Sequence, residues 1–267
     1  MKKKLLIIAV LSAIVFVMLF TSCTFNQDDI LTDKDTVKSV SITFADGLTS
    51  ELSKDDMNMV VSSIKKIGEM SYDLNNTLQG QVEWTYDYTF KLTVERKKFL
   101  FFKKERKEYY YFGTHVKHVN DKGVTKEYND DYEWCYLNNL KYTKQMDKDQ
   151  AVQFRERLDE INLELREEKY NGIKNLFKNA GYSVSELTDN DLSYVTNNDT
   201  GETVWVSASE GFFAVKGDES YHFYMTDDLD RAKSFAVKMS IYGGKNVGCL
   251  CGYGNVSDAE ILNSIYG

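Results

Sequence analysis

A stretch of strict alternation between apolar and polar residues most constrains the fold of this chain. It runs from Trp84 to Glu95. Successive side chains of a β-strand point to opposite faces, so one face would be aromatic and aliphatic and the other polar. Such a pattern is typical of an antiparallel sheet with one face in water. The apolar face would carry Trp84, Tyr86, Tyr88, Phe90, Leu92 and Val94.

Shorter strands are predicted on both sides of this stretch. Val40, Ile42 and Phe44 alternate with polar residues, and Ala45-Asp46-Gly47 is a turn signal before a return strand at 48–52. Further strands are expected at 99–102, 108–113, 115–119 and 124–128, and a helix is expected at 130–142 to close this first unit.

Three helices are predicted from their apolar spacing. Ser53 followed by Asp56 forms a capping signal for the first of them. The strongest spans 147–168, because apolar residues there recur at steps of three and four, and we interpret it as a connecting helix packed on one or both domains. A separate helix is expected at 170–180, ending at Gly181.

The remainder predicts a second unit of strands and helices. Strands are expected at Val184, at 204–207 with Trp205 pointing inward, in a hairpin of 212–215 with 221–224, and at 246–251. Helices are expected after Asp228 and at 257–265. Both halves therefore indicate an α+β fold, in which two small antiparallel sheets carry helices on one face. The expected domains are 36–145 and 169–267, joined by a helix at 146–168.

The first residues have the features of an export signal. Lys2, Lys3 and Lys4 precede an apolar run from Leu5 to Phe20, and small residues follow. The run is shorter than the ~20 residues of a membrane-spanning helix, which favours a signal peptide at 1–22 over an uncleaved anchor. Residues 23–35 would then form a polar tether.

The segment Leu19-Phe20-Thr21-Ser22-Cys23 resembles the lipobox of bacterial lipoproteins. The resemblance implies that Cys23 carries a diacylglycerol and that the chain is cut just before it. The pattern of small sheet-and-helix domains in both halves also resembles exported lipoproteins of low-G+C Gram-positive bacteria. This resemblance implies a location on the outer face of the cell membrane. Cys23 is therefore the expected lipidation site.

Charge and cysteine content narrow the class of partner. The formal net charge is −8, and phosphate binding needs clustered cations, so nucleic acid is not an expected partner. Besides Cys23 the chain has Cys135, Cys249 and Cys251, an odd number that does not make a disulfide framework. Cys249 and Cys251 are expected on one face of a strand as small apolar residues, and a bond from Cys135 to either stays open.

The motifs for catalysis and metal binding are weak. His115 and His118 are three apart in a predicted strand and would point to opposite faces, which makes them poor co-ligands. The segment 197–202 lacks the acids of a calcium loop and is better explained as a hairpin turn. No serine stands in a Gly-x-Ser-x-Gly elbow, and His222 has no visible catalytic partner. We therefore expect no catalytic residues, no metal site and no cofactor.

One basic and aromatic stretch stands out in this acidic chain. At the tip of a hairpin it would contact the anionic membrane surface or an anionic wall polymer. The alternative is a solvated turn beside a buried strand, with residues 99–102 in the core. The candidate contact residues are Arg96, Lys97, Lys98, Phe99, Phe101, Lys103, Lys104, Arg106 and Lys107.

The hypothesis that follows is a membrane-anchored extracytoplasmic lipoprotein that acts as a non-catalytic binding or interaction module. Its partners would be the membrane, through acylated Cys23, and an envelope protein or anionic wall polymer. The alternative is a small-ligand receptor or a hydrolase with a site between the two domains, since pockets favour domain interfaces.

Overall fold

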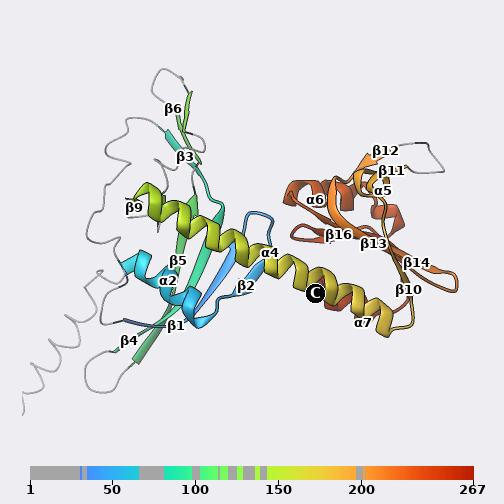
Figure 1. Cartoon of the computed structure of the whole chain (residues 1–267), viewed down its shortest axis with the longest axis horizontal. Helices are drawn as coiled ribbons and strands as arrows, with labels where there is room; N and C mark the ends of the chain where they lie inside the picture. Colours follow the sequence, from blue (N-terminus) through green and yellow to red (C-terminus); the bar gives the residue numbers. More distant parts are fainter. Residues whose placement is uncertain are drawn as a thin grey trace, which may run out of the picture.

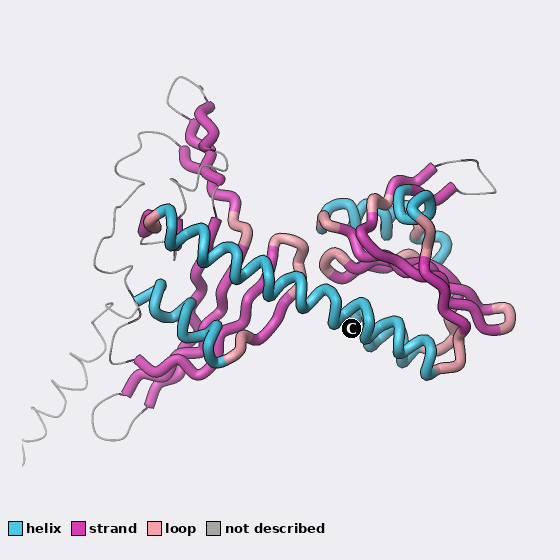
Figure 2. Tube along the Cα trace, viewed as in Figure 1, coloured by secondary structure: helices cyan, strands magenta, loops and turns pink. Residues whose placement is uncertain are grey.

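The computed structural model describes residues 31, 35–65, 81–97, 103–113, 115–119, 125–128, 136–138, 143–196, 201 and 203–267 (Figure 1). These residues form antiparallel sheets and helices, which confirms the α+β class. Helix α4 (Lys148–Asn179) runs along both of the larger sheets (Figure 2). The signal-peptide and lipidation predictions, Cys23 included, lie outside the described residues.

The first half is built on a six-stranded sheet with the order β2-β1-β4-β5-β8-β9. Helix α2 (Lys54–Lys65) and the first half of α4 cover one face of it, and Ser53 caps α2 as predicted. Phe154 of α4 packs against the rings of Phe90 and Phe112 at 5.9 and 5.0 Å between centroids. The strands are β1 (Asp35–Phe44), β2 (Thr49–Glu51), β4 (Tyr88–Lys97), β5 (Lys103–Gly113), β8 (Tyr136–Asn138) and β9 (Thr143–Gln145).

The predicted strand at 84–95 is two strands in different sheets. In β4 the apolar residues Tyr88, Phe90, Leu92 and Val94 are buried, which confirms the alternation. The chain bends at 86–87, where the Asp87 amide donates to the carbonyl of Phe112. The prediction of one continuous strand over 84–95 was therefore wrong. The residues before the bend form β3 (Gln81–Thr85), which joins β6 (His115–Val119) and β7 (Thr125–Tyr128) in a three-stranded sheet.

The helix predicted at 130–142 was wrong where the structure describes that range. Residues 136–138 form β8, which pairs with β5 on one side and β9 on the other. An open edge of β5 offers main-chain hydrogen bonds, and this pairing overrides the local helix preference.

The two helices predicted at 147–168 and 170–180 are one helix, α4. Asp147 caps its first turn by accepting from the amides of Asp149 and Gln150, and no proline interrupts it. Buried residues step by three or four up to Leu165, and the next buried residue is Tyr170. At 3.6 residues per turn this step of five moves the buried stripe around the helix. The first half of α4 thereby faces one sheet and the second half faces the other.

The second half is built on a five-stranded sheet with the order β10-β13-β14-β16-β15. The second half of α4 packs on one face, where the Tyr170 and Phe223 rings lie 6.3 Å apart. Helix α6 (Leu229–Lys238) covers the other face, where Phe235 meets Tyr224 at 5.2 Å. The prediction that helices cover only one face was therefore wrong for this sheet. Its strands are β10 (Ser183–Glu186), β13 (Ala208–Lys216), β14 (Glu219–Thr226), β15 (Lys245–Val247) and β16 (Leu250–Asn255).

Short elements complete the second half. Helix α5 (Asp189–Ser193) precedes β11 (Tyr194–Thr196), which pairs antiparallel with β12 (Thr203–Trp205). The turn predicted at 197–202 falls on residues of which only Gly201 is described. Trp205 is 67% exposed, so its inward placement was wrong, because Val204 and Val206 occupy the inward positions. A 3-10 turn η4 (Ser240–Tyr242) follows α6, and α7 (Ala259–Tyr266) ends the chain beside α4.

The strand predicted at 246–251 is also interrupted. Gly248 has a φ of 54°, and it forms with Cys249 the turn between β15 and β16. Cys249 and Cys251 consequently lie in different apolar clusters, so their placement on one face was wrong. Both are buried and free, while Cys135 lies outside the described residues.

One apolar core is continuous through both halves. It joins Phe44 and Leu48 of the first half to Cys249 and Leu250 of the second, and α4 contributes to it along its whole length. The β1–β2 turn and the β15–β16 turn meet at this junction. The two sheets are therefore held together by α4 and by direct contact between turns.

Candidate functional site

The described residues of the basic and aromatic stretch at 96–107, here called the basic island, are divided between two different settings. Arg96 donates two hydrogen bonds to the carboxylate of Asp35, at 2.7 and 2.8 Å, and Arg106 donates a third at 3.2 Å. The Asp35 side chain is fully buried between them. Arg106 also pairs with Glu108, which accepts from the Tyr110 hydroxyl. These two arginines therefore neutralise a buried acid where β1 begins.

The lysines of the island are placed differently. Lys97 pairs in register with Lys103, and Lys104 pairs with Arg96, so all three are at the closed end of the β4–β5 hairpin. Lys107 is exposed further along β5. Lys98, Phe99 and Phe101 lie outside the described residues. The structure thus separates the island into a buried arginine network and a set of lysines at the hairpin end.

A second polar network joins the two halves through Arg166 of α4. Its guanidinium donates to Asp46 of the β1–β2 turn at 2.9 Å, and to Ser209, the Thr226 carbonyl and Asp227, each at 3.0 Å. The Arg166 and Asp46 side chains are both largely buried. One arginine therefore connects the turn of the first sheet, the shared helix and two strands of the second sheet.

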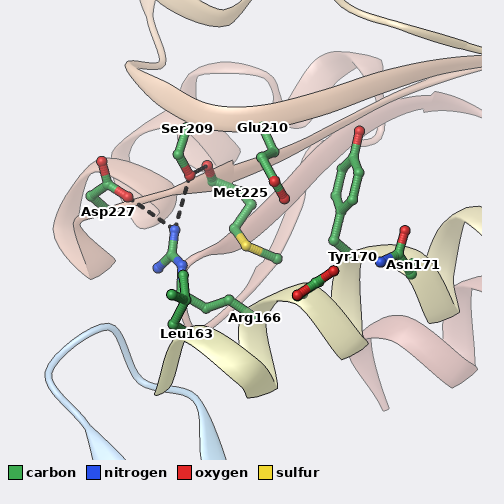
Figure 3. A pocket seen from close by; sticks show the side chains of 9 residues that line it. Leu163, Arg166, Tyr170, Asn171, Ser209, Glu210, Met225 and Asp227 are labelled. Atoms are coloured by element: carbon green, nitrogen blue, oxygen red, sulfur yellow. Dashed lines mark hydrogen bonds and ion pairs between the residues drawn. The ribbon is translucent and has the colours of Figure 1, made fainter. Parts of the chain in front are cut away.

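A groove of about 550 Å³ opens beside Arg166, between α4 and the ends of β13 and β14 (Figure 3). Ser209 is fixed within it, because its hydroxyl accepts from Arg166 and donates to the carbonyl of Met225. A smaller hollow of about 300 Å³ adjoins it and shares Tyr170, Ser209 and Glu210. The groove is lined by Leu163, Arg166, Glu167, Tyr170, Asn171, Ser209, Glu210, Met225 and Asp227.

Tyr170 stands at the boundary of the two hollows. Its hydroxyl donates to Glu186 and lies 3.0 Å from the carbonyl oxygen of Gly211. Burial, together with the negative charge of Glu210, raises the pKa of Tyr170 to about 12. Tyr170 is therefore a neutral hydrogen-bond donor at neutral pH, and Glu210 lies close enough to influence it.

A row of rings crosses the other face of the second sheet. His222 lies between Phe213 and Tyr253, with centroids 4.5 and 4.8 Å away, and is nearly parallel to the Tyr253 ring. Burial lowers the pKa of His222, and the charge of Asp191 opposes that shift. His222 is thus held as a neutral packing residue within this row.

The histidines and cysteines considered as possible ligands or nucleophiles do not form a metal site among the described residues. Among the described residues no group of three or more His, Cys, Asp and Glu side chains is placed to hold a metal ion. His115 and His118 are in β6, three residues apart. Burial raises the pKa of both Cys249 and Cys251 to about 12, which suits structural thiols rather than nucleophiles.

Sequence reasoning missed the two networks and the groove. The sequence identified Asp46 only as part of a turn, and Arg166 only as one residue of the helix predicted at 147–168. The only sequence signal for this network was that each of the two halves joined by α4 carries an acid, Asp46 in one and Asp227 in the other. The presence of these acids does not predict that either one contacts Arg166. The partners are distant in sequence, so they are visible only after folding.

Among the residues that the structure describes, none of the helices has the length and apolarity needed to cross a membrane. No protein-family model, no curated protein and no solved structure matches this chain. Functional inference therefore rests on the site geometry and on the N-terminal sequence.

Proposed function

We propose that this chain is a lipid-anchored extracytoplasmic protein that acts as a non-catalytic binding module. In this proposal the end of the first sheet at which β1 begins lies against the membrane. The anchor follows from the basic and apolar start and from the lipobox-like segment ending at Cys23. Two or more acyl chains give stable anchoring where one is marginal. Changing Cys23 to Ala is expected to leave a full-length, unacylated precursor.

In this proposal, only a short segment connects the acylated Cys23 to the folded core. Leu31 is 2% exposed and belongs to the core of the first half. Seven residues, 24–30, separate it from Cys23, so an extended chain spans at most about 28 Å between the two Cα atoms. Acylation of Cys23 would therefore keep Leu31, and the nearby start of β1, close to the headgroups.

The observation that carries the proposed orientation is the register of β1, β4 and β5. Asp35, the first residue of β1, pairs with Arg96, which in turn pairs with Lys104. Lys97 and Lys103 pair one step further toward the hairpin end. The lysines at the end of this hairpin thus share one end of the sheet with the tether. Each cation near an anionic membrane contributes about 1 kcal/mol.

Vesicle binding tests the orientation with the unacylated chain. Changing Lys97, Lys103 and Lys104 to Gln is expected to weaken binding to phosphatidylglycerol-rich vesicles by roughly 100-fold, since three cations contribute about 1 kcal/mol each. The matched control changes three exposed lysines of the second half, Lys178, Lys238 and Lys245. Equal loss in both variants would show a general charge effect and would overturn the proposed orientation.

A small-ligand receptor is the second candidate function, because a groove lies beside Arg166 between α4, which both halves share, and the second sheet. A hydrolase is less well supported. The Ser209 hydroxyl donates to a main-chain carbonyl, so its proton is not directed at a general base.

A further inference from the structure

The groove beside Arg166 has an apolar floor and polar walls. Met225 closes its base but is only 1% exposed, so it offers a ligand almost no surface, and the ring of Tyr170 forms part of one wall (Figure 3). Leu163 stands at the rim with most of its side chain in solvent. A volume of about 550 Å³ is within the range of small-molecule sites. The exposed side chain of Leu163 is therefore the main apolar surface that this groove offers to the methylene chain of a small ligand.

Two carboxylates of this groove are not neutralised by the fold. Among the described residues, no hydrogen bond or ion pair joins the side-chain carboxylate of Glu167 or of Glu210 to another side chain or to the main chain. Asp227, a third acid of the lining, is bound by Arg166. The groove therefore presents negative charge that lacks a compensating cation.

The one arginine of the lining does not reverse this balance. Arg166 is shared between Asp46 and Asp227, so its own charge is matched by two acids. Its donors point to these acids, to Ser209 and to the carbonyl of Thr226. An anionic ligand would have to displace those bonds, whereas a cation would meet Glu167 and Glu210 directly.

The adjoining hollow extends the groove away from α4, toward the end of β10 and helix α5. It reaches Glu186, whose carboxylate is bound by Lys174 and by the Tyr170 hydroxyl. The two hollows share Tyr170, Ser209 and Glu210, so they form one elongated depression with Glu210 near its middle. An extended ligand with separated charges fits this depression better than a compact ion.

We infer that this groove binds a linear aliphatic polyamine, with ammonium groups at Glu167 and Glu210 and the methylene chain against Leu163. This inference rests on the binding-module function and names its ligand class. Charge-assisted hydrogen bonds to carboxylates would hold the ammonium groups, and burial of the methylenes would add apolar contact.

Calorimetric titration of the unacylated chain with spermidine tests the inference. Binding with one site is expected, and changing both Glu167 and Glu210 to Gln is expected to weaken it at least tenfold. Both side chains are exposed at the groove, so the variant is expected to fold, which its thermal unfolding would verify. The matched control is Glu168→Gln, an exposed residue next to Glu167 that does not line the groove.

Three results would overturn the inference. Unchanged spermidine binding in the Glu167 and Glu210 variant would show that the groove is not the binding site. An equal loss of affinity in Glu168→Gln would indicate general charge attraction. Tighter binding of a tetralysine peptide than of spermidine would point to a basic protein segment instead. Vesicle binding of the same variants separates the two proposals, since groove variants are expected to bind vesicles normally.

Discussion

Gly47 and Gly248 meet back to back where the two sheets join. A Cβ on Gly47 would lie 2.9 Å from the Cα of Gly248, and a Cβ on Gly248 would lie 3.0 Å from the carbonyl carbon of Gly47. Both glycines have positive φ, at 82° and 54°. Only residues without a side chain allow the two turns to approach this closely, so these glycines determine how near the halves can pack.

Substituting either glycine by alanine is expected to destabilise the chain. A left-handed conformation costs a non-glycine residue about 1–2 kcal/mol, and the clash with backbone atoms adds to that cost. Gly217→Ala is the control, because Gly217 has a φ of 58° with no atom near its would-be Cβ. Urea unfolding should therefore rank Gly47→Ala and Gly248→Ala below Gly217→Ala in stability. Equal losses in all three would show that the contact is unimportant.

Arg166 is expected to be a major contributor to the junction. Arg166→Ala would leave the buried Asp46 carboxylate without its cation, and removing one partner of a buried pair costs about 3–5 kcal/mol. Arg166→Lys keeps the charge but cannot reach all four acceptors, so an intermediate loss is expected. Chemical denaturation measures both. A loss below about 1 kcal/mol in the alanine variant would show that solvent replaces these bonds.

Asp35→Asn is expected to loosen the entry of β1. The change leaves Arg96 and Arg106 side by side without the carboxylate that both bind. A loss of about 3–5 kcal/mol is expected by the same reasoning. Lys38→Ala serves as the comparison, because the Lys38–Glu95 pair is solvent-exposed on the lysine side and should contribute at most about 1 kcal/mol. Similar losses in the two variants would contradict the central role of Asp35.

His222 is expected to make stability fall in mild acid. Burial holds its folded-state pKa below the ordinary value of 6.5, so the unfolded chain binds the proton more readily. Stability is therefore intact above about pH 6.5 and declines as the pH falls toward the folded-state pKa. His222→Phe retains an aromatic ring between Phe213 and Tyr253 and should flatten this part of the melting-temperature profile. An unchanged profile would assign the acid sensitivity to other groups.

Cys249 and Cys251 are expected to resist thiol reagents in the folded chain. Burial raises both pKa values to about 12, so almost no thiolate exists at neutral pH. Iodoacetamide labelling followed by peptide mass mapping should modify both only after denaturation. Fast labelling of the native chain would show that the turn at Gly248 opens readily.

The α+β class and most individual elements were predictable because they depend on local patterns. Alternation in β4 and the Ser53 cap are signals that each segment carries by itself. The errors occurred where pairing partners decided the outcome. Residues 136–138 became a strand because β5 offered an edge, and the strands at 84–95 and 246–251 were divided by a bend and a turn with tertiary contacts.

The sequence alone determined the amphipathic surfaces of the strands and helices, and the predictions of an export signal and of lipidation at Cys23 rest on it entirely, because hydrophobic spacing and short motifs are local properties. Only the tertiary structure decided that Asp35 neutralises two arginines of the basic island, and that Arg166 links Asp46 to Asp227. It also decided that Glu167 and Glu210 share one groove. Buried ion pairs and grooves form between residues far apart in the chain, and their distances are defined only after the core has packed.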